Sequence, residues 1–176
     1  STGGVADEFA FLHGNKLITE CYRAVDDSTL LPNVKSKQHN CAALEITLGQ
    51  ICLKAHSACI IAITGAECDA KINDLAITNW QCHQLAAGDI IDFSLPRSGL
   101  HSYLAIRDGF TCDIAQKPWL GSFAQTGNEM ALGYTGKPLT LGSKVYFATQ
   151  QQCLAEPVLL ATKNVAPPYT RFYAQG

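Results

Sequence analysis

The feature that most constrains the fold is a series of short apolar segments between Cys41 and Gly109. Gly, Asn, Asp and Pro residues separate these segments, which lie at 43–48, 51–53, 58–63, 89–93 and 102–106. Short runs rich in β-branched and aromatic residues, bounded by turn residues, are typical of β-strands. The span shows no sustained helical period. It therefore predicts a mainly β fold, an antiparallel sheet that closes into a barrel or sandwich.

Turn residues suggest where the strands of this sheet end. Thr64, Gly65 and Ala66 are predicted to end an apolar strand, where a small turn lets backbone N–H groups approach an anion. Asn73-Asp74 predicts a hairpin, because both residues tolerate positive φ. The 96–99 segment (PRSG) predicts a turn between two strands.

The N-terminal part of the chain predicts one helix. Asp7 is placed to cap it, and Phe9, Leu12 and Leu17 follow at helical spacing. The polar stretch 21–40 has no period and predicts an exposed loop, in which His39 is more consistent with a solvated side chain than with a functional one. The abrupt Gly-rich start suggests that further residues precede it.

Composition narrows the function classes. The chain has 176 residues and a formal net charge of −2, with 13 Lys and Arg that are scattered. It therefore offers no basic field for nucleic acid or an anionic membrane. It also has no apolar run near the ~20 residues of a membrane-spanning helix. We expect a soluble cytoplasmic protein.

The cysteines could form a metal site or serve as ordinary apolar side chains. None of the 8 cysteines forms a C-x-x-C pair, and most lie inside apolar segments. Zinc sites need thiolates or imidazoles at short paired spacings, and only Cys82-His83 comes near this. We expect structural thiols and no metal.

Glu45 is the residue of greatest chemical interest, because it lies in the middle of an apolar strand. Strand alternation places it on the face opposite Leu44 and Ile46. That face could be exposed to solvent, which is the simpler interpretation. Alternatively, Glu45 could lie inside the mouth of a barrel, where a carboxylate would suit proton transfer or ligand binding. The residues alone indicate a β-barrel with a pocket near Glu45, Thr64 and Tyr103.

Several ordered motifs resemble the C subunit of bacterial 5-oxoprolinase, a family also known as allophanate hydrolase subunit 2 or the biotin-dependent carboxyltransferase domain family. They are AALEITLG (42–49), AITGA (62–66), AAGDI (86–90), SYLAI (102–106) and LGS (120–122). The segments TGGVAD (2–7) and NKL (15–17) also resemble the family's opening turn and helix. The similarity runs from the first residue to about Phe147, interrupted by 21–40, which resembles an insertion.

The resemblance implies a fold and a domain layout. It implies a cyclophilin-like β-barrel with one N-terminal helix over residues 1–160. Residues 161–176 contain Pro167-Pro168 and are expected to be a linker towards a second domain.

The resemblance also implies an activity and partners. The B and A subunits of 5-oxoprolinase would be protein partners in an assembly that opens 5-oxoproline to glutamate at the expense of ATP. Larger relatives carry carboxylate from biotin to urea.

Site residues follow from the same resemblance. Asp7, Glu45 and Tyr103 are the expected catalytic residues. The expected substrate-binding residues are Asn15, Thr64, Gly65, Ala66 and Ser122. The chain departs from the family at 121–125 (GSFAQ) and at His101-Ser102, where relatives commonly carry arginine. Arginine is the usual bidentate holder of carboxylate or phosphate, so these departures bear on anion binding.

Two functional hypotheses from different classes remain. In the first, the chain is an enzyme subunit whose pocket is shared with the B subunit, and Glu45 transfers a proton or contacts the substrate amide. In the second, it is a regulatory or binding module without turnover. A carboxyltransferase-type domain acting on urea or an amide is a third possibility.

Overall fold

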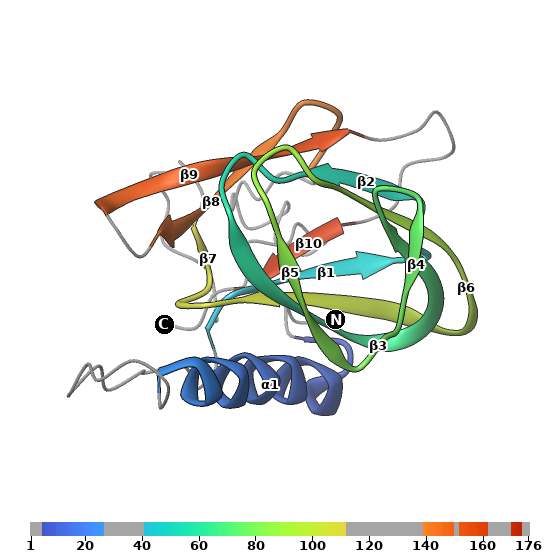
Figure 1. The fold of residues 1–176 in the computed structure, drawn as a ribbon. Coiled ribbons are helices and arrows are strands. Elements are labelled where there is room, and N and C mark those ends of the chain that lie inside the picture. The colour runs from blue at the N-terminus through green and yellow to red at the C-terminus, as the bar shows by residue number, and fades with distance from the viewer. Residues whose placement is uncertain (1–4, 27–40, 112–138, 150–151, 162–169, 174–176) are drawn as a thin grey trace, which may run out of the picture.

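The computed structural model describes residues 5–26, 41–111, 139–149, 152–161 and 170–173. Within these ranges there is one helix, α1 (Glu8–Asp26), and it lies along one side of a large β-sheet (Figure 1). The strands are β1 (Ala43–Thr47), β2 (Ile51–Lys54), β3 (Cys59–Ile72), β4 (Leu75–Ile77), β5 (Gln81–Leu85), β6 (Ile90–Ile106), β7 (Phe110–Thr111), β8 (Lys144–Thr149), β9 (Gln152–Ala161) and β10 (Thr170–Tyr173). No helix in the described part of the chain has the length and apolar character needed to cross a membrane.

The strands form one antiparallel 10-stranded sheet. Its main path runs β10-β1-β6-β2-β9-β8-β7, and β3 pairs with β4, β5 and β6. The mainly β class with one N-terminal helix is thus confirmed. The pairing within the described ranges does not close the sheet on itself, so the cyclophilin-like barrel stays a prediction.

Two long strands organise the sheet. β3 and β6 pair along most of their length, from Ile61↔Ile106 to Ile72↔Ile91. On its other side β6 pairs with β1 through its second half and with β2 through its first. The predictions that Thr64-Gly65-Ala66 ends a strand and that 96–99 separates two strands were wrong. Both segments lie inside continuous strands, at irregularities of the β3–β6 register that bend the strands instead of ending them.

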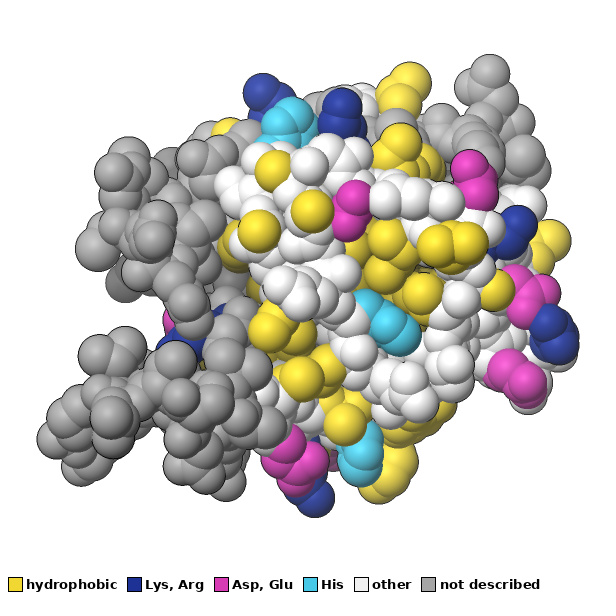
Figure 2. Space-filling model, in the orientation of Figure 1, with side chains coloured by type: hydrophobic (Ala, Val, Ile, Leu, Met, Phe, Trp, Pro, Cys, Tyr) yellow, Lys and Arg dark blue, Asp and Glu magenta, His cyan; other side chains and the backbone are white. Residues whose placement is uncertain are grey.

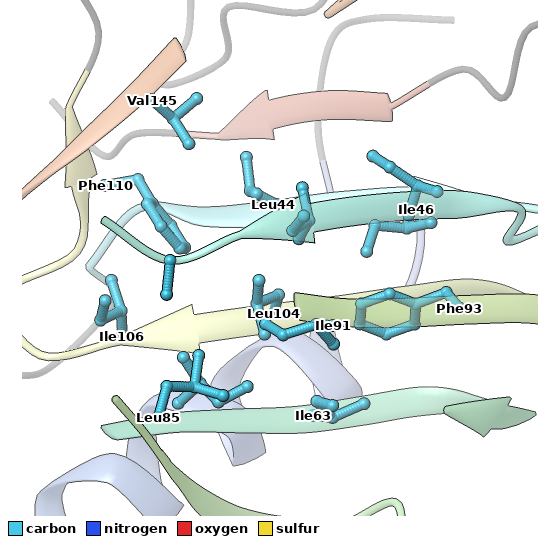
Figure 3. Close-up of a cluster of buried hydrophobic side chains, with 14 of the residues drawn as sticks. Leu44, Ile46, Ile63, Leu85, Ile91, Phe93, Leu104, Ile106, Phe110 and Val145 are labelled. Carbon is cyan, nitrogen blue, oxygen red and sulfur yellow. The ribbon is translucent and has the colours of Figure 1, made fainter. Parts of the chain in front are cut away.

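Strict alternation gives the sheet two different faces. On one face the large side chains of β1, β3 and β6 join residues of β2, β5, β7 and β8 in the main core (Figure 3). Residues of this core include Leu44, Ile46, Ile63, Leu104 and Phe93. Each fully buried aliphatic side chain of this kind contributes about 1.5–3 kcal/mol through the hydrophobic effect.

The other face of the same three strands carries small or polar side chains. These are Ala43 and Glu45 on β1, Ala62 and Thr64 on β3, and Tyr103 and Ala105 on β6, and all are buried. Helix α1 covers this face with Ala10, Phe11 and Ile18. A Cβ added to Gly14 would lie 3.1 Å from Thr64 Oγ1 and 3.3 Å from the Ala105 Cβ. The helix therefore approaches the sheet closely because both surfaces are small here.

Helix α1 begins where the sequence predicted, but it ends later than predicted. The Asp7 carboxylate accepts a hydrogen bond from the Ala10 N–H at 3.0 Å, which is the predicted N-cap. The helix continues to Asp26, so the loop expected from residue 21 was wrong for 21–26. Residues 27–40 lie outside the described ranges. Trp80 precedes β5 and is 38% exposed, and its ring centroid lies 5.9 Å from that of Phe9 and 5.5 Å from that of His13, both on α1.

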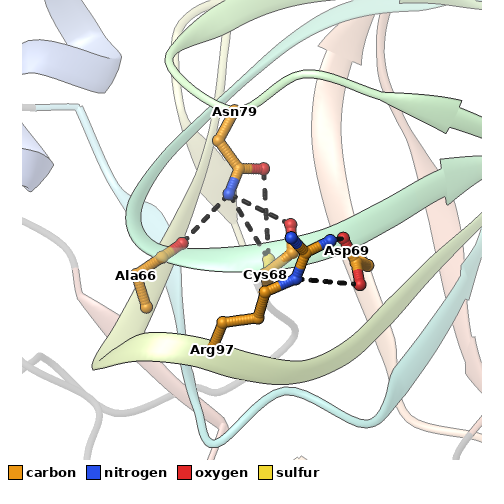
Figure 4. Close-up of polar contacts among 5 residues, drawn as sticks. All are labelled: Ala66, Cys68, Asp69, Asn79 and Arg97. Carbon is orange, nitrogen blue, oxygen red and sulfur yellow. Dashed lines mark hydrogen bonds and ion pairs between the residues drawn. The ribbon is translucent and has the colours of Figure 1, made fainter.

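Asn79 fills the irregular part of β3. Its side-chain N–H₂ donates to the carbonyl oxygens of Ala66 at 3.1 Å and Cys68 at 3.2 Å (Figure 4). These carbonyls lie where the β3–β6 register shifts. On the exposed side of the same bend, Arg97 of β6 pairs with Asp69 of β3. One amide side chain thus replaces ladder hydrogen bonds that the bend removes.

The last described segment belongs to the sheet. Within 161–176, expected to be a linker, Thr170–Tyr173 forms β10, which pairs with β1 from Ala43↔Tyr173 to Ile46↔Thr170. The second domain that this linker would lead to stays a prediction.

The Asn73-Asp74 hairpin is confirmed and is tied to a second turn. Asn73 and Asp74 both have positive φ between β3 and β4. The Asn73 side-chain amide donates to the Asp89 carboxylate at 2.7 Å, and the Ala86 N–H donates to the same carboxylate at 2.7 Å. These two hydrogen bonds hold the pKa of Asp89 below its ordinary value. Asp89 therefore links the β3–β4 turn to the turn before β6.

We expect Gly65→Ala to destabilise the fold more than Gly88→Ala. Both glycines have positive φ, of 90° and 97°, but an added Cβ at Gly65 collides with the His101 carbonyl oxygen, whereas nothing lies within 4 Å of one at Gly88. Backbone strain alone predicts a loss of about 1 kcal/mol for Gly88→Ala, and strain with the collision about 3 kcal/mol for Gly65→Ala. Urea unfolding of both variants measures the difference. Equal losses would show that the collision relaxes without cost.

We expect Asp89→Asn to flatten the acid limb of stability against pH. A carboxylate whose pKa is lowered on folding adds stability above its unfolded pKa, near 3.9, and loses it as pH falls through the folded value. The wild-type unfolding free energy should therefore drop more steeply below about pH 4 than that of the variant. Asp74→Asn, which removes a neighbouring carboxylate outside these hydrogen bonds, is the matched control. Identical acid limbs in wild type and Asp89→Asn would contradict the assignment.

Candidate functional site

Glu45 is fully buried on the helix-facing side of the sheet, so the solvent-exposed interpretation was wrong. Its Oε2 accepts a hydrogen bond from the Tyr103 hydroxyl at 2.7 Å and another from the Ala6 N–H at 3.0 Å. Tyr103 is also fully buried and pairs directly with Glu45 across the β1–β6 ladder. A buried carboxylate needs such donors, because its desolvation is otherwise costly.

Asp7 completes the group of three residues predicted to be catalytic. Its backbone N–H donates to the Tyr103 hydroxyl at 2.8 Å, while its carboxylate caps α1. The Tyr103 hydroxyl therefore joins the chain entering the helix to the Glu45 carboxylate. Ala6 and Asp7 are themselves exposed, so this short segment separates Glu45 from solvent.

His101 and Thr47 extend the network towards the surface. The His101 Nδ1 lies 3.7 Å from the second oxygen of the carboxylate, Glu45 Oε1, and 3.1 Å from the Thr47 hydroxyl. The His101 side chain is 28% exposed, whereas that of Glu45 is fully buried. An imidazole beside a carboxylate is a common proton-transfer arrangement. The network thus runs from a buried acid to a partly exposed base.

Sequence reasoning missed that His101 lies beside Glu45, and treated this residue only as a departure from the family. The spacing of polar residues on β1 and β6 could have indicated that His101 lies near Glu45. Glu45 and Thr47 are two residues apart on β1, Tyr103 and His101 are two apart on β6, and the register pairs Glu45 with Tyr103 and Thr47 with His101. Residues two apart on adjacent strands share one face, so four polar side chains meet there.

Thr64 and Asn15, predicted to bind substrate, lie in the same helix–sheet interface. The buried Thr64 hydroxyl donates to the Ala10 carbonyl oxygen at 2.7 Å. The Asn15 side-chain amide donates to the carbonyl oxygens of Phe11 at 3.3 Å and Cys41 at 3.2 Å. These bonds attach α1 to the sheet and to the chain before β1. A contact of either residue with substrate stays a prediction.

Gly65, also predicted to bind substrate, meets this cluster only through its backbone, which lies against the backbone of His101. Gly65 lies in the β3–β6 ladder opposite Ser102, and the Ala66 carbonyl oxygen is bonded to Asn79. Ser122 lies outside the described residues.

The described surface carries mixed charge. Figure 2 shows Lys and Arg side chains at the margins of one face, near Asp and Glu, with hydrophobic side chains between them.

Within the described ranges, no three His, Cys, Asp or Glu side chains come together as a metal site. The groups that meet at the Glu45 cluster are a carboxyl group, a phenol, a hydroxyl and an imidazole.

The sequence of this sheet matches a known protein family. The family model for the carboxyltransferase domain, subdomain A and B, covers residues 31–173. The chain therefore belongs to this carboxyltransferase-domain family.

Three curated relatives share parts of the sequence. The chain is 39% identical to the 5-oxoprolinase C subunit of Escherichia coli K12 over 84 residues, which is 47% of this chain and 26% of the relative. It is 32% identical over 108 residues to a putative urea carboxylase of Emericella nidulans, covering 61% of this chain and 8% of the relative. It is 26% identical over 166 residues to urea amidolyase of Lachancea kluyveri, covering 94% of this chain and 8% of the relative.

Two solved structures share the fold. Kluyveromyces lactis urea carboxylase superposes with a TM-score of 0.57 at 22% identity, over 98% of this chain and 13% of that one. The urea amidolyase of the same organism gives a TM-score of 0.56 at 21% identity, over 98% of this chain and 9% of that one. The chain therefore corresponds to about a quarter or less of the length of these relatives.

We expect Tyr103→Phe to destabilise the protein through Glu45. The change removes the hydroxyl that donates to Glu45 Oε2 and accepts from the Asp7 N–H, leaving a buried carboxylate with one donor fewer. Leaving a buried polar group without one of its partners costs about 1–3 kcal/mol, which is the expected loss in unfolding free energy. Denaturant unfolding checks the value.

A double-mutant cycle separates this effect from packing. If Tyr103 acts through the carboxylate, Tyr103→Phe should cost less in a Glu45→Gln background than in the wild type. Additive losses would show that the hydroxyl and the carboxylate are energetically independent.

Proposed function

We propose that this chain is part of one subunit of an ATP-dependent 5-oxoprolinase and contributes to cleaving 5-oxo-L-proline to L-glutamate with partner subunits. The observation that carries the proposal is the 39% identity to the 5-oxoprolinase C subunit. The aligned region covers 26% of that relative, so the activity is proposed for the assembly and not for the described domain alone.

The Glu45 cluster supports this reaction class. Opening a cyclic amide breaks a C–N bond, and the departing nitrogen needs a proton. A partly exposed imidazole backed by a buried carboxylate is suited to moving that proton, since His101 Nδ1 lies 3.7 Å from Glu45 Oε1. In the proposal, Glu45 and His101 transfer protons, and Tyr103 with Ala6 holds the carboxylate in place.

The same cluster is poorly suited to hold ATP. Triphosphates are bound by cationic side chains and by cradles of backbone N–H groups. The groups around Glu45 are instead an acid, a phenol, a hydroxyl and an imidazole, and the Ala6 N–H there already donates to the carboxylate. We therefore assign ATP, which would activate the amide, to the partner subunits. These partners are proposed to be the B and A subunits of 5-oxoprolinase.

A second candidate function is carboxyl transfer from biotin to urea or another amide. It is favoured by the extent of the similarity to urea amidolyase, which spans 94% of this chain. Here the Glu45 cluster would move a proton of the amide that accepts the carboxyl group. The identities to the putative urea carboxylase and to urea amidolyase, 32% and 26%, are lower than the 39% to the 5-oxoprolinase C subunit, which makes this the weaker candidate.

We expect Glu45→Gln to abolish most of the turnover. The variant keeps the shape of the side chain and removes its charge, so proton transfer should slow by about 10²-fold or more. The measurement is ATP-dependent glutamate release from 5-oxoproline by the full-length protein reconstituted with the A and B subunits. Glu67→Gln, which changes an exposed glutamate on β3, is the matched control and should keep wild-type activity.

The outcomes separate the candidates. A stable complex whose Glu45→Gln form is inactive would support the proposed role. Full activity in the variant would remove Glu45 from the chemistry. A stable wild-type complex that releases no glutamate would overturn the proposed activity, and biotin-dependent carboxylation of urea would then distinguish the second candidate from a module without turnover.

A further inference from the structure

The imidazole of His101 has two polar neighbours on the same side of its ring. Its Nδ1 lies 3.1 Å from the Thr47 hydroxyl and 3.7 Å from Glu45 Oε1. The distance to Thr47 is that of a hydrogen bond, whereas the distance to Glu45 is too long for one. Of these two neighbours, Thr47 is therefore the one that holds the orientation of the ring.

The sheet keeps the Thr47 hydroxyl in place. Thr47 and His101 are direct partners in the β1–β6 ladder. Side chains paired in this way lie on the same face, with Cβ atoms about 4.5–5.5 Å apart. Threonine is branched at Cβ, so few rotamers are open to its hydroxyl. Glu45 lies two residues before Thr47 on β1 and therefore shares this face.

This orientation gives the two ring nitrogens different surroundings. Nδ1 is directed towards the fully buried Glu45, whereas the His101 side chain is 28% exposed, and Nε2 lies at the edge of the ring away from Nδ1. In a neutral imidazole, the contacts of one nitrogen decide which nitrogen carries the proton. An ionised Glu45 beside Nδ1 favours the proton there, which leaves the lone pair on Nε2.

We propose that Thr47 is a positioning residue whose hydroxyl holds His101 with Nδ1 towards Glu45, so that Nε2 is the atom that exchanges a proton with the amide substrate. The exchange with substrate rests on the proposed function, whereas the orientation of the ring does not. Thr47 would not touch the substrate and would act only through His101.

The proton inventory of this arrangement balances. Nε2 takes a proton from water, and the ring becomes an imidazolium with a proton on each nitrogen. Nε2 then gives its proton to the departing amide nitrogen, and the ring returns to the neutral form with Nδ1 still protonated. Glu45 stabilises the imidazolium in between, because the positive charge forms beside its carboxylate.

The test measures the protonated nitrogen of His101 by long-range ¹H–¹⁵N NMR of the full chain. The spectra are read in the high-pH plateau, where the ring is neutral and its two nitrogens resonate far apart. His101→Asn identifies which of the 5 histidine signals belongs to His101. We expect the wild-type ring to carry its proton mainly on Nδ1.

Two substitutions at Thr47 separate the hydroxyl from the shape of the side chain. In Thr47→Val the ratio of Nδ1–H to Nε2–H should fall about fivefold, the worth of one hydrogen bond, because the ring is released to turn away from Glu45. Thr47→Ser restores the hydroxyl and should restore the ratio. Valine keeps the β-branched shape that suits a strand, and Thr47→Ala serves if the valine variant does not fold.

Thr111→Val is the matched control. It removes the hydroxyl of an exposed threonine on β7 and should leave the His101 signals unchanged. In the assembly reconstituted with the A and B subunits, Thr47→Val should lower kcat for glutamate release about tenfold with little change in KM, and Thr47→Ser should recover most of it.

Three results would overturn the positioning role. They are a wild-type ring protonated mainly on Nε2, a ratio that Thr47→Val leaves unchanged, and a folded Thr47→Ser variant that loses the ratio as fully as Thr47→Val. The NMR measurement needs no turnover. An assembly that releases no glutamate would therefore count against the proposed function, while the spectra would still decide the orientation of the ring.

Discussion

The structure of this domain depends on the burial of one carboxylate. Glu45 sits in the middle of β1 with no access to solvent, so its carboxyl oxygens need hydrogen-bond donors inside the protein. Those donors come from separate parts of the chain: the Ala6 N–H before α1 and the Tyr103 hydroxyl on β6. The chain entering the helix is thus fixed to the centre of the sheet by the hydrogen bonds that a buried carboxyl group needs.

The close contact between α1 and the sheet also depends on the face of the sheet that carries Glu45. Alanines at 43, 62 and 105 leave room for α1, and Gly14 lets its backbone reach Thr64. The family match begins at residue 31, after α1, whereas Glu45 and Tyr103 lie within it. The sheet of a carboxyltransferase-type domain and a preceding helix therefore share one polar cluster, and the partly exposed His101 is the point where that cluster approaches the surface.

Local patterns in the sequence predicted much of this arrangement, and the failures have physical reasons. The strand alternation, the Asp7 cap and the Asn73-Asp74 hairpin are local, and all three are found. Gly65 and Pro96 were misread as strand ends, because a bend within a paired strand and a turn use the same residues. The burial of Glu45 could not be read from β1 alone, since the covering helix and the Ala6 N–H lie elsewhere in the sequence. The resemblance to the family supplied Asp7, Glu45 and Tyr103 together, and the structure brings these three residues into contact, whereas their chemical roles still rest on the proposal.

The pairing of β6 has a consequence for how the domain opens. Along one edge β6 is bonded to β3, and along the other it is bonded first to β2 and then to β1. A local opening that frees β1 or β2 leaves β6 held by β3, but separating β3 from β6 breaks the ladder that joins both halves of the sheet. We therefore expect the amide protons bonded between β3 and β6 to be among the slowest of the described sheet to exchange with solvent.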